Sequence, residues 1–152
     1  MSGCIRYAVR IIPIGCPDVS EISVRMSPKY AVILLNVKEE DIALEEYDLI
    51  GIASGIAYSK FYKEIEQVVK EKMPEGKNAF LMYTCGKPGQ DFAKSIKNTL
   101  LLKKCNVLGT YCCKGYDTYG PFKLFGGINK KNPTEDEIHG AVRFYREIID
   151  KL

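Results

Sequence analysis

The chain has 152 residues, of which 46% are apolar and 27% are charged, and its net charge is +3. This length suits one hydrophobic core, so we expect a single domain over residues 1–152. The longest apolar stretches fall short of the roughly 18 residues that a membrane-spanning helix needs, and Met1–Arg10 lacks the pattern of a secretory signal. We therefore expect a cytoplasmic protein without a membrane span. The small basic excess does not favour nucleic acid as a partner.

Five apolar runs rich in β-forming residues predict strands. In chain order they are Ile5–Ile14, Tyr30–Val37, Tyr47–Ser54, Asn78–Cys85 and Cys105–Cys113. The last four are apolar on both faces, which is typical of parallel strands that helices cover on each side. The first run is less typical, because Arg6, Arg10 and Pro13 fit a central strand poorly.

Amphipathic segments alternate with these runs and predict helices. They are Asp18–Met26, Lys60–Lys72, Pro88–Lys104 and Pro133–Leu152. The last has the clearest apolar stripe and a start signal, because Asn132 can cap the helix and Pro133 suits its first turn. Strands that alternate with helices predict β-α-β crossovers and an α/β fold of three layers.

In an open parallel sheet, ligands bind beyond the carboxyl ends of the strands. This rule selects four loops, which are Gly15–Ser20, Ser54–Ser59, Thr84–Asp91 and Lys114–Gly120. Their glycines let a flat ligand approach the main chain. Four aromatic residues in or beside these loops can stack on such a ligand: Tyr58, Phe61, Tyr116 and Tyr119. A place in the core at the start of a helix explains Tyr58 and Phe61 equally well.

Six cysteines are present, at positions 4, 16, 85, 105, 112 and 113. None is spaced as Cys-x-x-Cys, and no cluster of cysteine and histidine occurs, so we expect neither a disulfide framework nor a metal site. On a strand, the adjacent Cys112 and Cys113 point to opposite faces. The single histidine, His139, lies within the last predicted helix, and we expect it at the surface.

Three segments resemble the flavodoxin family. Tyr47–Ile65 (YDLIGIASGIAYSKFYKEI) resembles the third strand, a flavin loop and the next helix, and Phe80–Gly89 (FLMYTCGKPG) resembles the fourth strand and its flavin loop. Cys112–Ile138 is similar to the C-terminal stretch of a short-chain flavodoxin-like subgroup. The resemblance implies a flavodoxin-like three-layer sandwich with a five-stranded parallel sheet in the order 2-1-3-4-5.

In this family, the loops after the third and fourth strands hold the isoalloxazine ring of FMN. The resemblance therefore implies that ten residues contact the cofactor: Ser54, Gly55, Ile56, Ala57, Tyr58, Ser59, Thr84, Cys85, Gly86 and Tyr116. It also implies electron transport by a flavoprotein oxidoreductase, with a redox partner protein or a quinone-like small molecule as acceptor. The oligomeric state stays open, with a homodimer among the alternatives.

The segment after the first predicted strand departs from the family pattern. Family members bind the FMN phosphate with a hydroxyl-rich loop of the type Ser/Thr-x-Thr-Gly-Asn-Thr, whereas this chain reads Gly15-Cys16-Pro17-Asp18-Val19-Ser20. Pro17 removes an amide donor, and Asp18 adds a negative charge where the phosphate would sit, unfavourable by about 1 kcal/mol or more. The net charge of +3 also departs from electron-carrier flavodoxins, which are typically acidic.

Two alternatives to an FMN-dependent redox function stay open. The first is a flavodoxin-fold protein that has lost FMN binding and acts as an interaction module or subunit, and the composition of Gly15–Ser20 favours it. The second is thiol-based redox sensing through Cys85 or the pair Cys112 and Cys113. That function requires an exposed thiol with a lowered pKa.

Overall fold

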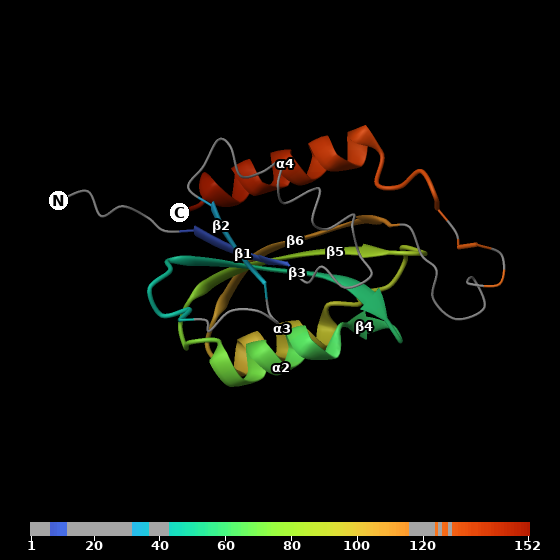
Figure 1. The fold of residues 1–152 in the computed structure, drawn as a ribbon. Helices are drawn as coiled ribbons and strands as arrows, with labels where there is room; N and C mark the ends of the chain where they lie inside the picture. The colour runs from blue at the N-terminus through green and yellow to red at the C-terminus, as the bar shows by residue number, and fades with distance from the viewer. Residues whose placement is uncertain (1–6, 12–31, 37–42, 116–123, 125, 128) are drawn as a thin grey trace.

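The computed structural model describes residues 7–11, 32–36, 43–115, 124, 126–127 and 129–152. Its five parallel strands are β1 (Tyr7–Ile11), β2 (Val32–Asn36), β3 (Leu49–Ala57), β5 (Asn78–Cys85) and β6 (Asn106–Lys114). They form one sheet in the order β2-β1-β3-β5-β6 (Figure 1). A sixth, two-residue strand, β4 (Lys60–Phe61), pairs antiparallel with the end of β3. Among the parallel strands, the predicted order 2-1-3-4-5 is confirmed.

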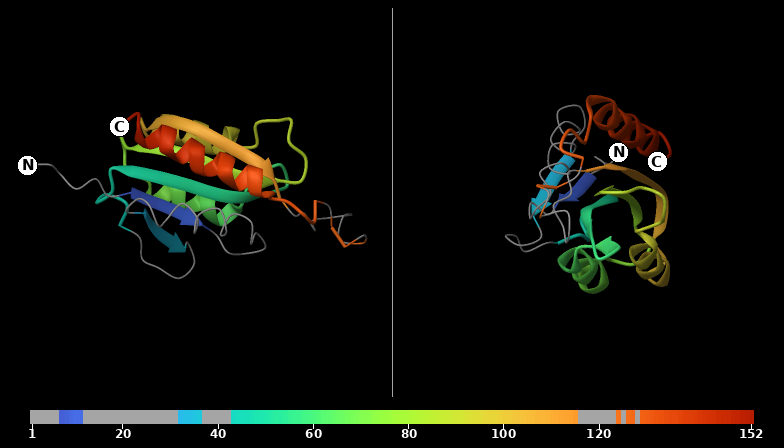
Figure 2. Two further views of the ribbon diagram at one scale, coloured as in Figure 1. Left: turned by 90° about the horizontal axis from the view of Figure 1, so that it is seen from above. Right: turned by 90° about the vertical axis from the view of Figure 1, so that its right-hand side faces the viewer.

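Among the described residues, three helices cover the two faces of the sheet. Helices α2 (Lys63–Lys72) and α3 (Lys94–Leu102) lie side by side on one face, and α4 (Glu135–Ile149) lies on the other (Figures 1 and 2). This is the predicted three-layer α/β sandwich. The helix predicted over Asp18–Met26 lies outside the described residues. None of the described helices is long and apolar enough to cross a membrane.

The central strands alternate their side chains between the two helical layers, as the pleat of a strand requires. Along β5, Leu81 and Tyr83 pack in a core cluster with residues of α2 and α3, whereas Phe80 and Met82 pack in a second cluster with α4. Both faces of β5 are therefore buried, which explains why its sequence is an unbroken apolar run.

One close approach inside the sheet requires a glycine. A Cβ atom added to Gly51 of β3 would lie 2.4 Å from Cζ of Phe80, the facing residue on β5. The ring of Phe80 fills that space and packs against Tyr145 of α4, with ring centroids 5.6 Å apart. Gly51 therefore leaves room for a large aromatic ring between the sheet and α4.

The start of α4 differs from the sequence prediction by two residues. The capping residue is Thr134, not Asn132: the Thr134 hydroxyl accepts a hydrogen bond from the Glu137 N–H at 3.3 Å, and the Glu137 carboxylate accepts one from the Thr134 N–H at 2.7 Å. Asn132 instead donates from Nδ2 to the same carboxylate at 2.8 Å. This reciprocal pattern is a capping box, whose Thr-x-x-Glu spacing is visible in the sequence.

Candidate functional site

A tight hairpin closes one side of the carboxyl edge of the sheet. We expected a loop over Ser54–Ser59 and a helix from Lys60, but β3 continues to Ala57 and the chain turns back at once into β4. The two turn residues, Tyr58 and Ser59, have φ values of 51° and 63°. Positive φ at both central residues is the signature of a type I′ turn, which suits the twist of a two-residue hairpin.

Ser54 holds this hairpin against the start of α2. Its side chain is 1% exposed, and its hydroxyl donates to the Gly55 carbonyl at 2.6 Å. The same oxygen accepts a hydrogen bond from the Tyr62 N–H at 3.1 Å, eight residues further along the chain. Both hydrogen-bonding roles of the hydroxyl are therefore used within the protein, and Ser54 positions the hairpin.

The second side of the edge is the loop between β5 and α3, which contacts from other segments hold in place. The carbonyl of Cys85 accepts from the Gly115 N–H at 3.0 Å, and the carbonyl of Gly86 accepts from Asn129 Nδ2 at 2.6 Å. At the far end of the loop, Asp91 Oδ1 accepts from the Ala93 N–H at 3.0 Å.

Asp91 also pairs with a lysine of α3. Its Oδ2 lies 2.8 Å from Nζ of Lys97. The hydrogen bond from Lys97 is the main reason why the pKa of this carboxyl lies below its usual range, with a further contribution from the Ala93 N–H. Asp91 therefore ends the loop and starts α3, so the helix begins at Lys94 and not at the predicted Pro88.

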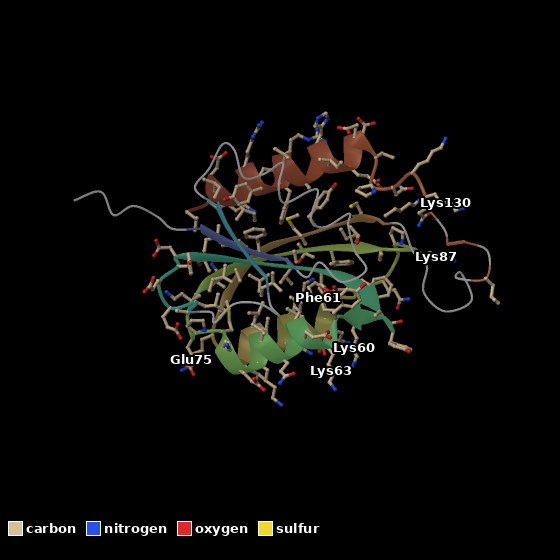
Figure 3. All side chains as sticks on the ribbon, in the orientation of Figure 1. Lys60, Phe61, Lys63, Glu75, Lys87 and Lys130 are labelled. Carbon is tan, nitrogen blue, oxygen red and sulfur yellow. The ribbon has the colours of Figure 1, made fainter. Side chains whose placement is uncertain are left out.

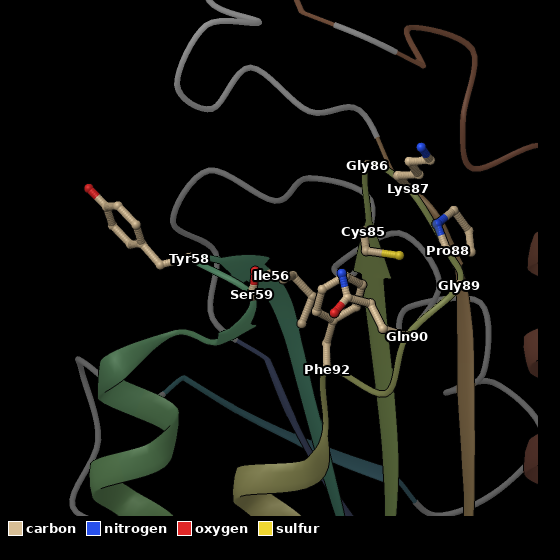
Figure 4. Close-up of a pocket in the computed structure, with 10 residues that line it drawn as sticks. All are labelled: Ile56, Tyr58, Ser59, Cys85, Gly86, Lys87, Pro88, Gly89, Gln90 and Phe92. Atoms are coloured by element: carbon tan, nitrogen blue, oxygen red, sulfur yellow. The ribbon is translucent and has the colours of Figure 1, made fainter.

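A pocket of about 540 Å³ opens between the hairpin and this loop (Figure 4). Ten residues line it: Ile56, Tyr58, Ser59, Cys85, Gly86, Lys87, Pro88, Gly89, Gln90 and Phe92. In Figure 4, Ile56, Cys85, Gln90 and Phe92 lie together, whereas the ring of Tyr58 points outward. The pocket lies beyond the carboxyl ends of β3 and β5, where ligands bind in open parallel sheets.

Part of the predicted cofactor-binding set lines this pocket. Those residues are Ile56, Tyr58, Ser59, Cys85 and Gly86. Four others are not among the lining residues: Ser54, Gly55, Ala57 and Thr84, all of which lie within strands. Tyr116, Tyr119 and the segment Gly15–Ser20 lie outside the described residues. Contact of any of these residues with a cofactor stays a prediction.

Five of the lining residues are not among those that the flavodoxin resemblance assigns to the cofactor. They are Lys87, Pro88, Gly89, Gln90 and Phe92. The predicted loop Thr84–Asp91 already contained four of them, but Phe92 was placed on the apolar stripe of a helix. The signal for the whole loop was present in Gly86-Lys87-Pro88-Gly89, because two glycines around a proline seldom continue into a helix.

The wall of the pocket joins an aromatic cluster in the core. Tyr83 contacts Phe92 with ring centroids 6.2 Å apart and Phe61 with centroids 5.5 Å apart, both edge to face. Burial, together with the neighbouring Cys112, raises the pKa of Tyr83 well above its usual value. The tyrosine is therefore neutral at physiological pH, and the wall next to the pocket is apolar.

The two aromatic residues considered for stacking have different environments. Phe61 is 1% exposed and belongs to the core, so the core interpretation is right for it. Tyr58 is 81% exposed at the rim of the pocket, so the core interpretation is wrong there. Its position on the type I′ turn places an aromatic ring beside the pocket mouth.

The described cysteines are free, as expected. Cys85, Cys105 and Cys113 are buried, and Cys112 is exposed, so the adjacent pair on β6 does point to opposite sides. The pocket-lining Cys85 is only 4% exposed, which is a poor fit to a thiol sensor. Within the described part of the chain, no group of three metal-binding side chains gathers, and His139 is at the surface.

Several solved structures share this fold. A flavodoxin from the domain Archaea matches with a TM-score of 0.68 and 16% identity, and the match covers 96% of each chain. A flavodoxin mutant from Fusobacterium nucleatum bound to flavin mononucleotide matches with a TM-score of 0.66 and 12% identity, over 97% of this chain and 96% of that one. The general stress protein 14 from Treponema denticola, in complex with FMN, matches with a TM-score of 0.64 and 11% identity, over 98% and 99%.

These likenesses establish a flavodoxin-like fold. No family model matches the sequence. The uncharacterized protein MJ0298 from Methanocaldococcus jannaschii is 44% identical over 108 residues, which are 70% of this chain and 72% of that protein. The chain belongs to the same family as MJ0298. This member of the MJ0298 family has the flavodoxin-like fold that its sequence predicts, and the pocket lies at the carboxyl edge of that fold.

Proposed function

We propose that this member of the MJ0298 family binds FMN, with the isoalloxazine ring in the pocket between the β3–β4 hairpin and the β5–α3 loop, and that it transfers electrons through the bound flavin. The position of the pocket carries the proposal, because it opens beyond the carboxyl ends of two adjacent central strands. Two proteins of the same fold, from Fusobacterium nucleatum and Treponema denticola, are bound to FMN.

The size and walls of the pocket fit a flat aromatic ligand. Its volume of about 540 Å³ lies within the range of about 300–1,000 Å³ that is usual for small-molecule sites. The side chains of Ile56, Pro88 and Phe92 give it apolar walls, which would shield one part of the ring from water. Tyr58 is at the mouth with its ring pointing outward, so it would stack on a bound ligand only after its side chain turns inward.

The main chain of the β5–α3 loop is accessible to a ligand. Gly86 and Gly89 line the pocket without side chains, and Gly89 has a φ of 141° with no heavy atom within 4 Å of the position of an added Cβ. The backbone amides near these glycines can orient the polar edge of a ring. FMN, when bound, supplies the one-electron and two-electron chemistry, while the residues of the pocket hold it and exclude water.

The direct test is a titration of FMN with the purified protein, followed by quenching of flavin fluorescence. We expect saturable quenching with a dissociation constant in the micromolar range or below. Gln90→Trp places an indole at the pocket, where Gln90 is exposed and outside the core, and we expect it to weaken FMN binding about tenfold or more. The matched control is Gln67→Trp on the exposed surface of α2, which should bind FMN like the unmodified protein.

Electron transfer needs a second measurement. FMN bound to the protein is photoreduced without oxygen and mixed with a quinone such as menadione, and the recovery of flavin absorbance is followed. We expect reoxidation kinetics that differ from those of free FMN. Absence of quenching at tens of micromolar protein would contradict FMN binding and would favour the alternative of an interaction module. Equal effects of the two tryptophan variants would contradict the placement of the ring.

A further inference from the structure

The carboxyl edge of the sheet carries exposed lysines from four different segments. We call them the rim lysines: Lys60 of β4, Lys63 of α2, Lys87 of the β5–α3 loop and Lys130 of the β6–α4 segment. All four are exposed, and Figure 3 shows them at the end of the molecule where the pocket opens, with Glu75 at the opposite end. Lys87 lines the pocket, whereas the other three are not among its lining residues.

The rim lysines lack acidic partners among the described residues. The ion pairs among the described residues are Lys97 with Asp91 and Lys104 with Glu75, and neither pair includes a rim lysine. The described segments around the pocket mouth, 56–64, 85–94 and 129–131, contain six lysines and two acids. One of the two acids, Asp91, is already paired with Lys97. These three described segments therefore carry a net positive charge at the surface.

Two of the lysines around the pocket work against local helix stability. Lys63 and Lys94 are the first residues of α2 and α3, at the helix end where the macrodipole is positive and a cation is unfavourable. The first turn of α3 contains no acid, although Asp91 accepts a hydrogen bond from the Ala93 N–H just before the helix. The first turn of α2 contains Glu64 and Glu66 beside Lys63. In contrast, α4, on the other face of the sheet, begins with three acids in its first turn. The first turn of α3, beside the pocket, thus contains lysines and no acid, whereas the first turn of α4 is acidic.

We propose that this basic rim docks an acidic electron-transfer protein over the pocket mouth. The rim lysines are exposed and come from four segments, so they do not converge on one buried point as a site for a small anion does. A broad cationic surface around a redox group instead steers an oppositely charged protein into contact with it. The inference rests on the proposed electron transfer at this pocket, because the docked partner would exchange electrons with the flavin there.

The test uses rubredoxin, an acidic protein with one Fe(III) centre, as the probe. The FMN-loaded protein is photoreduced and mixed with oxidised rubredoxin in a stopped-flow instrument. One electron passes from the reduced flavin to the iron, which becomes Fe(II) as the flavin is oxidised by one electron. We expect the second-order rate constant to fall about tenfold as ionic strength rises from about 20 to about 300 mM. With basic cytochrome c as acceptor, salt should not slow the reaction.

Two double variants lower the net charge of the protein by the same amount at different places. Their comparison distinguishes an effect of charge at the rim from an effect of total charge. Lys60→Glu/Lys130→Glu alters the rim without touching a pocket-lining residue, and we expect a rate about tenfold lower at low salt with an FMN dissociation constant unchanged within about twofold. The control is Lys70→Glu/Arg146→Glu, at exposed positions in the last turns of α2 and α4, which should change the rate less than about twofold. Equal slowing by both variants, or a rate that does not depend on salt, would overturn the proposal.

A measurement without flavin tests docking of the acidic protein independently of FMN binding. The ¹⁵N-labelled protein is titrated with rubredoxin in the absence of FMN, and amide shifts are followed by NMR. Shifts at the rim segments that disappear in high salt would support docking even if FMN does not bind. Shifts that are absent, or that concentrate at the opposite end of the sheet, would overturn it. Weaker FMN binding in Lys60→Glu/Lys130→Glu would instead assign these lysines to the cofactor and would also overturn it.

Discussion

Ser54 shows how a residue next to a ligand site can serve the fold. The flavodoxin resemblance implies that Ser54 contacts the cofactor, but its oxygen is buried and hydrogen-bonded to Gly55 and Tyr62. These contacts join the end of β3 to the start of α2, so the hydroxyl fixes the hairpin that forms one side of the pocket. Its effect on flavin binding would therefore be indirect.

The substitution Ser54→Ala tests this structural role. It removes the acceptor of the partly buried Tyr62 N–H, so we expect the free energy of unfolding to fall by about 1 kcal/mol. Urea denaturation followed by circular dichroism measures the change. Ser95→Ala, at an exposed position of α3, is the control and should change stability by less than about 0.5 kcal/mol. A large loss of FMN affinity without a loss of stability would show that Ser54 is a direct ligand.

At the scale of elements, the β3–β4 hairpin combines unfavourable backbone geometry with a position at the pocket. Tyr58 and Ser59 both adopt positive φ, a region that costs residues with side chains roughly 1–2 kcal/mol each. Asn-Gly or Gly-Gly is the usual choice in such a turn. Non-glycine residues in strained turns cluster at functional sites, and this turn places Tyr58 and Ser59 in the pocket lining.

Glycine at the second turn position should therefore stabilise the protein. We expect Ser59→Gly to raise the free energy of unfolding by about 1 kcal/mol, because glycine adopts positive φ without a steric penalty. The same change within a helix, Ser95→Gly in α3, should lower it by about 0.5–1 kcal/mol. Thermal unfolding of both variants measures the contrast. Destabilisation by Ser59→Gly would mean that the serine side chain makes a contact that outweighs the strain.

The capping box at the start of α4 should make the stability of the protein depend on pH. Burial opposes ionisation of Glu137, but hydrogen bonds from the Thr134 N–H, Asn132 and the Lys114 N–H outweigh it and hold the pKa of this carboxyl below its usual value. A carboxyl whose pKa is lower in the folded than in the unfolded chain contributes stability above the unfolded value. That contribution disappears as the pH falls through the folded value.

We expect Glu137→Gln to lower stability by about 1 kcal/mol at pH 7, where the charged capping box is intact. At pH 3 the difference in the free energy of unfolding between the variant and the unmodified protein should shrink. The Glu137 carboxyl is then largely protonated in the unfolded chain and increasingly protonated in the folded chain. Urea denaturation at the two pH values measures it. Glu147→Gln, an exposed change on the same helix, is the control. A difference that grows toward low pH would contradict the role of the cap.

At the scale of the whole molecule, burial decides which elements the sequence predicts well. The strand predicted over Asn78–Cys85 has the same bounds as β5, because burial on both faces requires an unbroken apolar run. The hairpin after β3 was missed because Tyr58-Ser59 lacks the glycine or asparagine that marks a type I′ turn. The late start of α3 was missed because Pro88 suits a first helical turn, whereas the Asp91 cap is only visible in three dimensions.

The candidate site was predictable in its location and only partly in its residues. The rule for open parallel sheets located it after β3 and β5, and the pocket lies there. Ser54 and Thr84 belong both to the predicted strands and to the predicted loops that follow. The rule does not show which side chains at a strand end face the ligand, so both were assigned to the cofactor although both are buried strand residues. The rim lysines went unnoticed because they are dispersed in the sequence, and only the fold brings them to one edge.

The two ends of an FMN molecule should contribute unequally to binding. The pocket offers apolar walls and main chain for the ring, whereas the sequence Gly15–Ser20 lacks the hydroxyl-rich phosphate loop and contains Asp18. We expect riboflavin, which has no phosphate, to bind within about tenfold of FMN, a difference of about 1.4 kcal/mol. Fluorescence titration of both flavins measures the ratio.

The substitution Asp18→Ser extends this comparison to the charge itself. The flavodoxin resemblance implies that Asp18 lies beside the FMN phosphate, where like charges about 4 Å apart repel by about 1 kcal/mol even in water. Removal of this charge should therefore strengthen FMN binding about fivefold to tenfold. Riboflavin affinity should stay the same, since it carries no charge there. Asp150→Ser removes an equal charge at the C-terminal cap of α4 and should affect neither flavin. If Asp18→Ser strengthened the binding of both flavins equally, the effect of Asp18 would lie at the ring. If the unmodified protein bound riboflavin far more weakly than FMN, other residues would hold the phosphate.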